Sequence, residues 1–166
     1  MFDPTIFDNL KVLLEGAVYD LDLNGDLVVQ ERKDLVNLAD MSRQYRIKFS
    51  GNKGKSEQAV EFELSMANEA MQKEWNGLAV HTGCRIFLLF TYQEALSEEG
   101  MPEEQRIREI WGDEVSISHQ ISIEKTPAGK IQKSHLIKLD FGRLINEDNA
   151  EDLEKMVRFA LVTLEK

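Results

Sequence analysis

Cys84-Arg85-Ile86-Phe87-Leu88-Leu89-Phe90-Thr91-Tyr92 is the stretch that decides the fold of this chain. Positions 86 to 90 carry no polar side chain, so the run has no face suited to water. Its short length, its β-branched and aromatic residues and the glycine before it favour a strand over a buried helix. We therefore predict a central strand that apolar residues from the rest of the chain cover on both faces.

A hairpin between residues 45 and 64 is predicted together with its register. Apolar residues alternate with basic ones on the first strand and with acidic ones on the second. One register places all the apolar residues on one face and opposite charges across from each other on the other face. It pairs Phe49 with Val60, Ile47 with Phe62, Tyr45 with Leu64, Lys48 with Glu61, and Arg46 with Glu63.

In the N-terminal part the spacing of apolar residues changes from a helical period to strand-like alternation after Gly16. Asp3-Pro4 has the features of a helix start, and the apolar spacing up to Leu14 predicts a helix that stops at Gly16. From Ala17 the pattern alternates, and a loop at Asn24-Gly25-Asp26 predicts a hairpin over residues 17–29. Residues 31–41 have helical spacing and are predicted as a short helix.

The C-terminal part gives clearer signals. Residues 68–75 predict a short helix that ends at Gly77, and Pro102 opens a helix that ends at Gly112. The segment 94–100 is predicted as a surface loop or helical turn. Residues 115–141 predict a second hairpin with a turn at 127–129, and this register pairs Ile121 with His135 and His119 with Ile137. A last helix has an apolar stripe made of Leu153, Met156, Val157, Ala160, Leu161 and Leu164.

These elements predict one α+β domain over residues 1–166. An antiparallel sheet of about six or seven strands is built from hairpins, and the N-terminal and C-terminal helices pack mainly on one of its faces. The chain of 166 residues is long enough to bury a core without disulfide or metal.

The net charge and the cysteine content limit which classes of partner and which cellular compartment are expected. The net charge of −10 argues against nucleic acid and anionic membrane as partners. Arg46 and Lys48 are expected to pair with Glu63 and Glu61 inside the hairpin. Cys84 is the single cysteine, and no apolar run of about 20 residues or secretory signal is found. We expect a cytoplasmic protein.

One stretch matches the spacing of a calcium-binding loop. Acidic or amide residues occupy the first, third, fifth and seventh places from Asp20, glycine the sixth, and glutamate the twelfth. The ligands would be Asp20, Asp22, Asn24, Asp26 and Glu31. The same letters are typical of an amphipathic hairpin with an Asn-Gly turn, which we favour because Leu21 and Leu23 sit at places that face water in such loops.

The histidines offer a second candidate site. In the predicted register His119 and His135 lie diagonally on one face, close enough for their side chains to meet. His81 and Cys84 would add a third imidazole and a thiolate to a metal set. Two ordinary histidines with one hydrogen-bond partner each are the simpler interpretation, and Cys84 is expected to be an inert core thiol.

The motifs of hydrolases, zinc proteases and dinucleotide-binding proteins do not occur in the sequence. The leading hypothesis is therefore a small acidic non-enzymatic protein that acts by binding another protein or itself, as a homo-oligomer. No cofactor is expected. The alternatives are a calcium-binding protein that uses Asp20–Glu31, and a metal-dependent or acid–base enzyme built around His81, His119 and His135.

Overall fold

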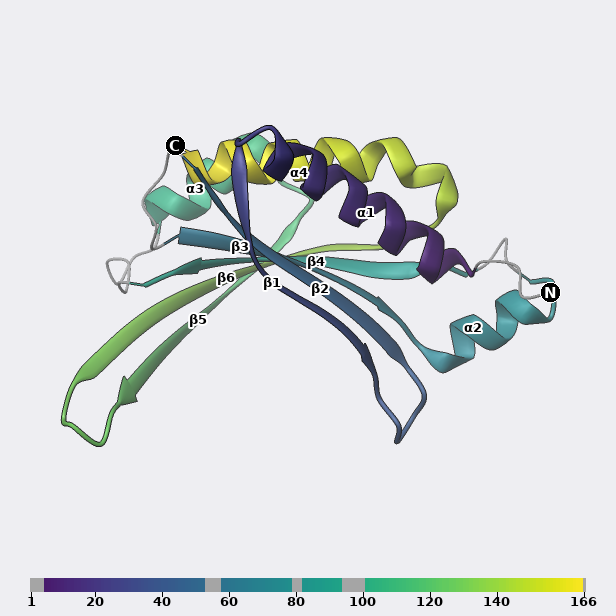
Figure 1. Cartoon of the computed structure of the whole chain (residues 1–166), viewed down its shortest axis with the longest axis horizontal. Helices are drawn as coiled ribbons and strands as arrows, with labels where there is room; N and C mark the ends of the chain where they lie inside the picture. Colours follow the sequence, from purple (N-terminus) through teal and green to yellow (C-terminus); the bar gives the residue numbers. More distant parts are fainter. Residues whose placement is uncertain (1–4, 53–57, 79–81, 94–100, 166) are drawn as a thin grey trace.

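The computed structural model describes residues 5–52, 58–78, 82–93 and 101–165. In chain order they form helix α1 (Ile6–Leu23), strands β1 (Leu27–Val36), β2 (Arg43–Gly51) and β3 (Gln58–Met66), helix α2 (Asn68–Trp75), strand β4 (Cys84–Tyr92), helix α3 (Met101–Trp111), strands β5 (Ser116–Lys125) and β6 (Ile131–Ile145), the short 3-10 helix η2 (Glu147–Asn149) and helix α4 (Ala150–Glu165). The fold is α+β, as predicted (Figure 1). Among these residues no helix is long and apolar enough to cross a membrane.

The strands form one antiparallel sheet of six strands in the order β1-β2-β3-β4-β6-β5. Strand β4, the stretch predicted to be central, lies inside the sheet between β3 and β6. β6 pairs with β4 after α3 and β5 have intervened, so β5 becomes an outer edge and β1 the other. The predicted register of β2 on β3 is confirmed, and so are the pairs Ile121 with His135 and His119 with Ile137.

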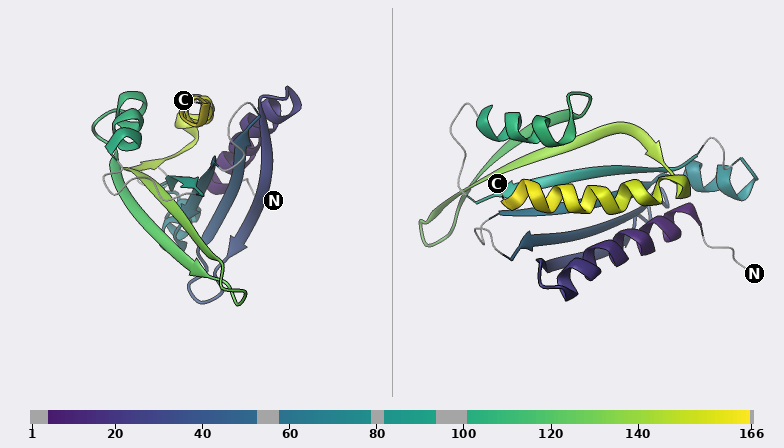
Figure 2. Two further views of the ribbon diagram at one scale, coloured as in Figure 1. Left: turned by 90° about the vertical axis from the view of Figure 1, so that its left-hand side faces the viewer. Right: turned by 90° about the horizontal axis from the view of Figure 1, so that it is seen from above.

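Helices α1, α3 and α4 lie over one face of the sheet, whereas α2 lies past the ends of the strands (Figures 1 and 2). The core forms between α1, α4 and the sheet. Alternate residues of each inner strand point into it, and burying each large side chain stabilises the fold by about 1.5–3 kcal/mol. Its fully buried members include Phe7, Leu10, Leu14, Val18, Tyr45, Ile47, Phe49, Val60, Phe62, Leu64, Leu88, Phe90, Ile137, Leu139 and Val157.

The prediction that β4 is covered on both faces is wrong for one face. No helix lies over that face in the part of the chain that the structure describes (Figure 2). Phe87 points to it yet is only 8% exposed, because the charged ends of two long side chains lie on its ring. The Lys138 Nζ is 4.2 Å and the Arg85 Cζ 5.0 Å from the ring centroid. Cation–π contacts and aliphatic stems thus replace a second layer.

Helix α1 is longer than the sequence predicted. The predicted stop at Gly16 is wrong, because the helix continues for about two more turns to Leu23. Glycine inside a helix costs only about 1 kcal/mol relative to alanine. The apolar spacing also continues across it, since Leu14 and Val18 are four residues apart and both fully buried. The predicted hairpin over residues 17–29 is therefore wrong.

The Asn24-Gly25 signal ends a helix here instead of turning a hairpin. Gly25 has a φ of 79°. The Asp26 N–H donates to the Leu21 carbonyl at 2.9 Å and the Gly25 N–H to the Asp22 carbonyl at 3.0 Å. This pair of hydrogen bonds is the Schellman motif, in which a glycine with positive φ satisfies the last carbonyls of a helix.

The short helix predicted over residues 31–41 is also wrong. Residues 27–36 form β1, which pairs with β2 and contains a bulge between Val29 and Glu31. The bulge explains the error, because the extra residue breaks the alternation by which a strand is recognised. A loop at residues 37–42 then joins β1 to β2.

The helices predicted at residues 68–75, at residues 102–111 and at the C-terminus are confirmed as α2, α3 and α4. Gly77 and Gly112, the predicted ends of α2 and α3, both have positive φ. The predicted start of the first helix at Asp3-Pro4 and the predicted loop or turn at 94–100 lie outside the described residues.

Candidate functional site

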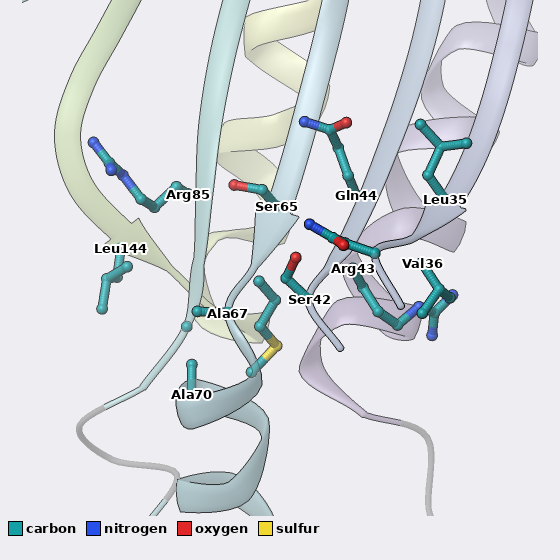
Figure 3. Close-up of a pocket in the computed structure, with 13 residues that line it drawn as sticks. Leu35, Val36, Ser42, Arg43, Gln44, Ser65, Ala67, Ala70, Arg85 and Leu144 are labelled. Carbon is teal, nitrogen blue, oxygen red and sulfur yellow. The ribbon is translucent and has the colours of Figure 1, made fainter. Parts of the chain in front are cut away.

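The end of the sheet nearest α2 carries a pocket with a volume of about 630 Å³ (Figure 3). Its floor is a row of side chains on the helix-free face, one from each of five adjacent strands. Each residue is the cross-strand partner of the next, in the order Leu35, Gln44, Ser65, Arg85 and Leu144. We call this pocket the α2-end groove.

The walls of the α2-end groove come from its two ends. Val36 and Ser42 belong to the β1–β2 connection on one side, and Met66, Ala67 and Ala70 to the end of β3 and the start of α2 on the other. Figure 3 shows these side chains grouped around the ends of the strands. The lining combines aliphatic side chains with hydroxyl, amide and guanidinium groups, and contains neither a carboxylate nor an imidazole among the described residues.

The loop at 37–42 holds two apolar side chains in water beside the groove. Leu38 is 83% and Met41 51% exposed. Met41 has a φ of 59°, a left-handed conformation that is unfavourable for a side chain of this kind. The Asn37 N–H donates to the Ser42 carbonyl at 2.9 Å, which closes the loop. The loop is therefore fixed in a strained shape that leaves Leu38 and Met41 uncovered.

Arg43 fixes the β1 side of the groove. Its guanidinium donates to Asp8 of α1 at 2.9 Å and to Asp34 of β1 at 3.1 Å. It also lies over the Phe7 ring, with its Cζ 4.5 Å from the centroid. One side chain thus ties α1, β1 and β2 together, so the groove is formed before any partner arrives.

Gly83 fixes the opposite side, where β4 begins against the end of β6. A Cβ atom at this position would lie 2.4 Å from the Ile145 carbonyl oxygen, so only glycine permits this close approach of the two backbones. Arg85, two residues on, forms an ion pair with Asp140 at 3.2 Å. Its charge is therefore compensated within the chain.

The predicted histidine pair is formed, and a carboxylate joins it. His119 Nδ1 lies 2.9 Å from His135 Nε2, and His119 Nε2 lies 2.8 Å from Glu104 Oε2. Because the carboxylate accepts, His119 donates from Nε2, and when His119 is neutral its Nδ1 accepts the Nε2 proton of His135. His135 Nδ1 is then an unprotonated nitrogen, which is buried and has no hydrogen-bond partner among the described residues.

This chain of hydrogen bonds joins α3 to the β5–β6 hairpin. The hydrogen bond from His119 holds the pKa of Glu104 below its ordinary value. Two imidazoles provide fewer ligands than a protein zinc site, which uses three or four. The described residues contain no group of three or more His, Cys, Asp and Glu side chains that could hold a metal ion. His81 lies outside them, and a metal site at these histidines stays a prediction.

Acid is expected to destabilise the fold through His135. Burial, and then the charge of His119, lower the pKa of His135, while Glu103 acts weakly in the opposite direction. The unfolded chain therefore binds a proton at a higher pH than the folded chain. The contribution of His135 to the free energy of unfolding is fully present above the unfolded-state pKa of about 6.5. It is lost as the pH drops toward the lower folded-state pKa. Urea unfolding across this range measures the effect.

The matched variant is His135→Gln, which has no proton to gain. Its unfolding free energy is expected to change less with pH than that of the wild type between about pH 7 and pH 5, and carboxyls that titrate in this range act equally in both proteins. Equal slopes for the two proteins would show that His135 does not titrate differently in the folded and unfolded states.

The residues of the calcium-loop pattern lie in three different elements. Asp20 and Asp22 belong to the last turns of α1, Asn24 and Asp26 to the turn that follows, and Glu31 to β1. A calcium loop wraps its oxygens around one ion from a non-helical backbone. These residues do not form such a loop, and calcium binding by them stays a prediction.

Cys84 is buried and unpaired, as expected for a core thiol. Burial raises the pKa of its thiol to about 12, which keeps it protonated at neutral pH.

Comparison of the chain with protein-family models, curated proteins and solved structures gives no match.

Proposed function

We propose that this chain is a non-enzymatic protein-interaction domain whose α2-end groove binds a segment of another protein. The observation that carries the proposal is the gathering of exposed apolar side chains at this one end. Leu35, Val36 and Leu144 line the groove, and Leu38 and Met41 lie in the loop between its lining residues Asn37 and Ser42. Leaving apolar residues in water is unfavourable, so contiguous groups of them mark binding surfaces.

The chemistry of the lining supports binding and not catalysis. A largely apolar pocket with a few polar groups that fix orientation is typical of recognition sites, and a volume of about 630 Å³ lies within their usual range. Without a carboxylate or an imidazole in the described lining, the groove has no general acid or base. Met41 adds an adaptable surface, because unbranched thioether side chains repack easily around different partners.

The partner segment that fits best has large apolar side chains flanked by basic residues. The apolar side chains would fill the groove and contact Leu38 and Met41. The two arginines in the lining are already paired with Asp8, Asp34 and Asp140, so they leave little positive charge there. The chain as a whole carries −10, which attracts a basic segment and accelerates its association.

We also propose a cytoplasmic location. The support is that the single cysteine is a buried free thiol, and a chain that needs no disulfide suits a reducing compartment.

Selection of displayed peptides tests the proposed function. Random peptides are selected on the wild type, and binders are measured against a variant that carries both Leu38→Asp and Met41→Asp. We expect binders rich in large apolar residues, with at least a tenfold weaker affinity for the variant, because the substitutions replace two apolar contacts by charges and a loss of about 1.4 kcal/mol is already tenfold.

The control is Val12→Asp, at an exposed valine on the outer side of α1. It adds a carboxylate to an equally accessible apolar position and is expected to leave affinity unchanged. Circular dichroism confirms that all variants are folded. A selection without apolar binders, or binders that do not distinguish the double variant from the wild type, would contradict the proposal.

A further inference from the structure

Strand β5 is an edge of the sheet without the features that protect edges. It has 10 residues and pairs with β6 in a continuous register. From Ser116 to Ile123 it contains no Lys, Arg, Asp, Glu or Pro. Natural edges are usually interrupted by such residues or by bulges, because an unprotected edge pairs with other strands.

The opposite edge of the same sheet shows the contrast. Strand β1 has the same length but is bulged after Val29 and carries the charged run from Glu31 to Asp34. Lys11 and Arg32 tie this edge to α1 through ion pairs with Asp34 and Glu15. Within the residues that the structure describes, β1 is therefore protected and β5 is left open.

The backbone of β5 offers hydrogen bonds along its outer side. The Thr126 N–H donates to the Lys130 carbonyl at 2.8 Å, which begins the ladder with β6. Pairing groups alternate along an antiparallel strand, so even-numbered residues continue this ladder and odd-numbered residues direct their N–H and C=O groups away from β6. Ile117, His119, Ile121 and Ile123 thus present backbone groups at the edge that pair with no other strand among the described residues.

Apolar side chains accompany these groups. Ile117, Ile121 and Ile123 share one face of β5, because alternate residues of a strand point to the same side. Val115 is buried, whereas Ile121, Ile123 and Ile131 are each more than half exposed. They lie toward the tip of the hairpin, which extends away from the helices (Figure 1). The described part of the chain leaves this apolar group uncovered.

We propose that two copies of the chain pair through their β5 strands, antiparallel, into one continuous sheet. In the register that we assign, Ser122 faces Ser122 of the second copy at the twofold axis, and Ile121 faces Ile123. Gln120 then opposes Glu124, and His119 opposes Lys125, near the Glu104 carboxylate that His119 contacts. With a neutral His119 no like charges meet, and every odd-numbered residue faces another odd-numbered one, as the outward backbone groups require.

The partner of the β5 edge is a second copy of the chain, because β5 complements itself in this register. An interface of this kind is isologous, so the same residues serve on both sides. The α2-end groove lies away from β5, and both grooves stay open in the pair. The inference therefore does not depend on the proposed function.

Disulfide trapping tests the pairing and its register together. Ser122 is exposed, and its partner in the pair is itself, at a position where opposed Cα atoms are about 4.5 Å apart, within disulfide range. Ser122→Cys is expected to give a covalent dimer on mild oxidation. Ser118→Cys, on the same face of the same strand, would oppose Thr126 and is expected to give no covalent dimer. The native Cys84 is buried and does not interfere.

Light scattering coupled to size exclusion gives the second readout. The wild type is expected to show a dimer that Ile121→Lys dissociates, because a lysine replaces half of each apolar pair. Adding Ile123→Glu to that variant restores the dimer, since each new lysine faces a new glutamate. A wild type that stays monomeric at high concentration, or cross-linking at 118 and not at 122, would overturn the proposal.

Discussion

Replacing Phe62 by alanine is expected to lower the free energy of unfolding by about 3–5 kcal/mol. Phe62 is fully buried on β3, between Ile47 on β2 and Leu88 on β4. Its ring stacks on that of Phe49, with centroids 5.9 Å apart. The substitution removes apolar surface and leaves a cavity that surrounding strands cannot close. Urea denaturation at constant m-value measures the loss.

Phe87→Ala is the matched control on the other face of the sheet. The side chains of Arg85 and Lys138 lie over the Phe87 ring, and they are flexible and can move into the space that the ring leaves. We expect a clearly smaller loss than for Phe62. A loss at Phe87 as large as at Phe62 would mean that the helix-free face is packed by something other than these two cations.

Replacing Val18 by aspartate is expected to cost more than about 4 kcal/mol, enough to unfold much of the protein. Val18 is fully buried on α1 among apolar neighbours, so the carboxylate would lose its hydration without gaining a partner. Leu23→Asp is the matched substitution. Leu23 is 86% exposed at the end of the same helix, and its replacement is expected to change stability by less than about 0.5 kcal/mol.

The same pair of variants separates the helix from the hairpin that the sequence predicted for residues 17–29. In a hairpin with Leu21 and Leu23 on the buried face, Val18 would be on the polar face. Leu23→Asp would then be the damaging change and Val18→Asp the tolerated one. Thermal melts followed by far-UV circular dichroism give the order directly.

Residues 17–25 show why local pattern did not suffice there. Helical spacing through Leu14, Val18 and Leu21 overlaps with alternation through Leu21 and Leu23. Asn-Gly serves a hairpin turn and a helix end equally well, because both need positive φ at glycine. What decides between them is the burial of Val18 against the sheet, which depends on contacts far away in the sequence.

Elsewhere the local signals agreed with the tertiary structure. The β2–β3 register followed from charge and apolar parity, and the β5–β6 register followed from the turn at 127–129. That second register was enough to predict that His119 and His135 meet. It did not predict Glu104, whose helix reaches the hairpin through the packing of α3.

The α2-end groove could be predicted only in part. Extending the predicted β2–β3 register by one residue places Gln44 beside Ser65, as observed. The rest of the row needs Arg85 beside Leu144, which is a pairing of β4 with β6 across more than 50 residues. Leu35, Leu38 and Met41 all fell in the segment 31–41 that was predicted as a helix, and no local sign shows that Leu38 and Met41 stay exposed.

Hydrogen–deuterium exchange with a selected peptide tests the central claim most directly. If the α2-end groove is the binding surface, the peptide slows exchange in residues 35–44 and 65–71, while residues 116–125 of β5 exchange as before. Protection confined to β5, to the helix-covered face or to any region away from α2 would contradict the account.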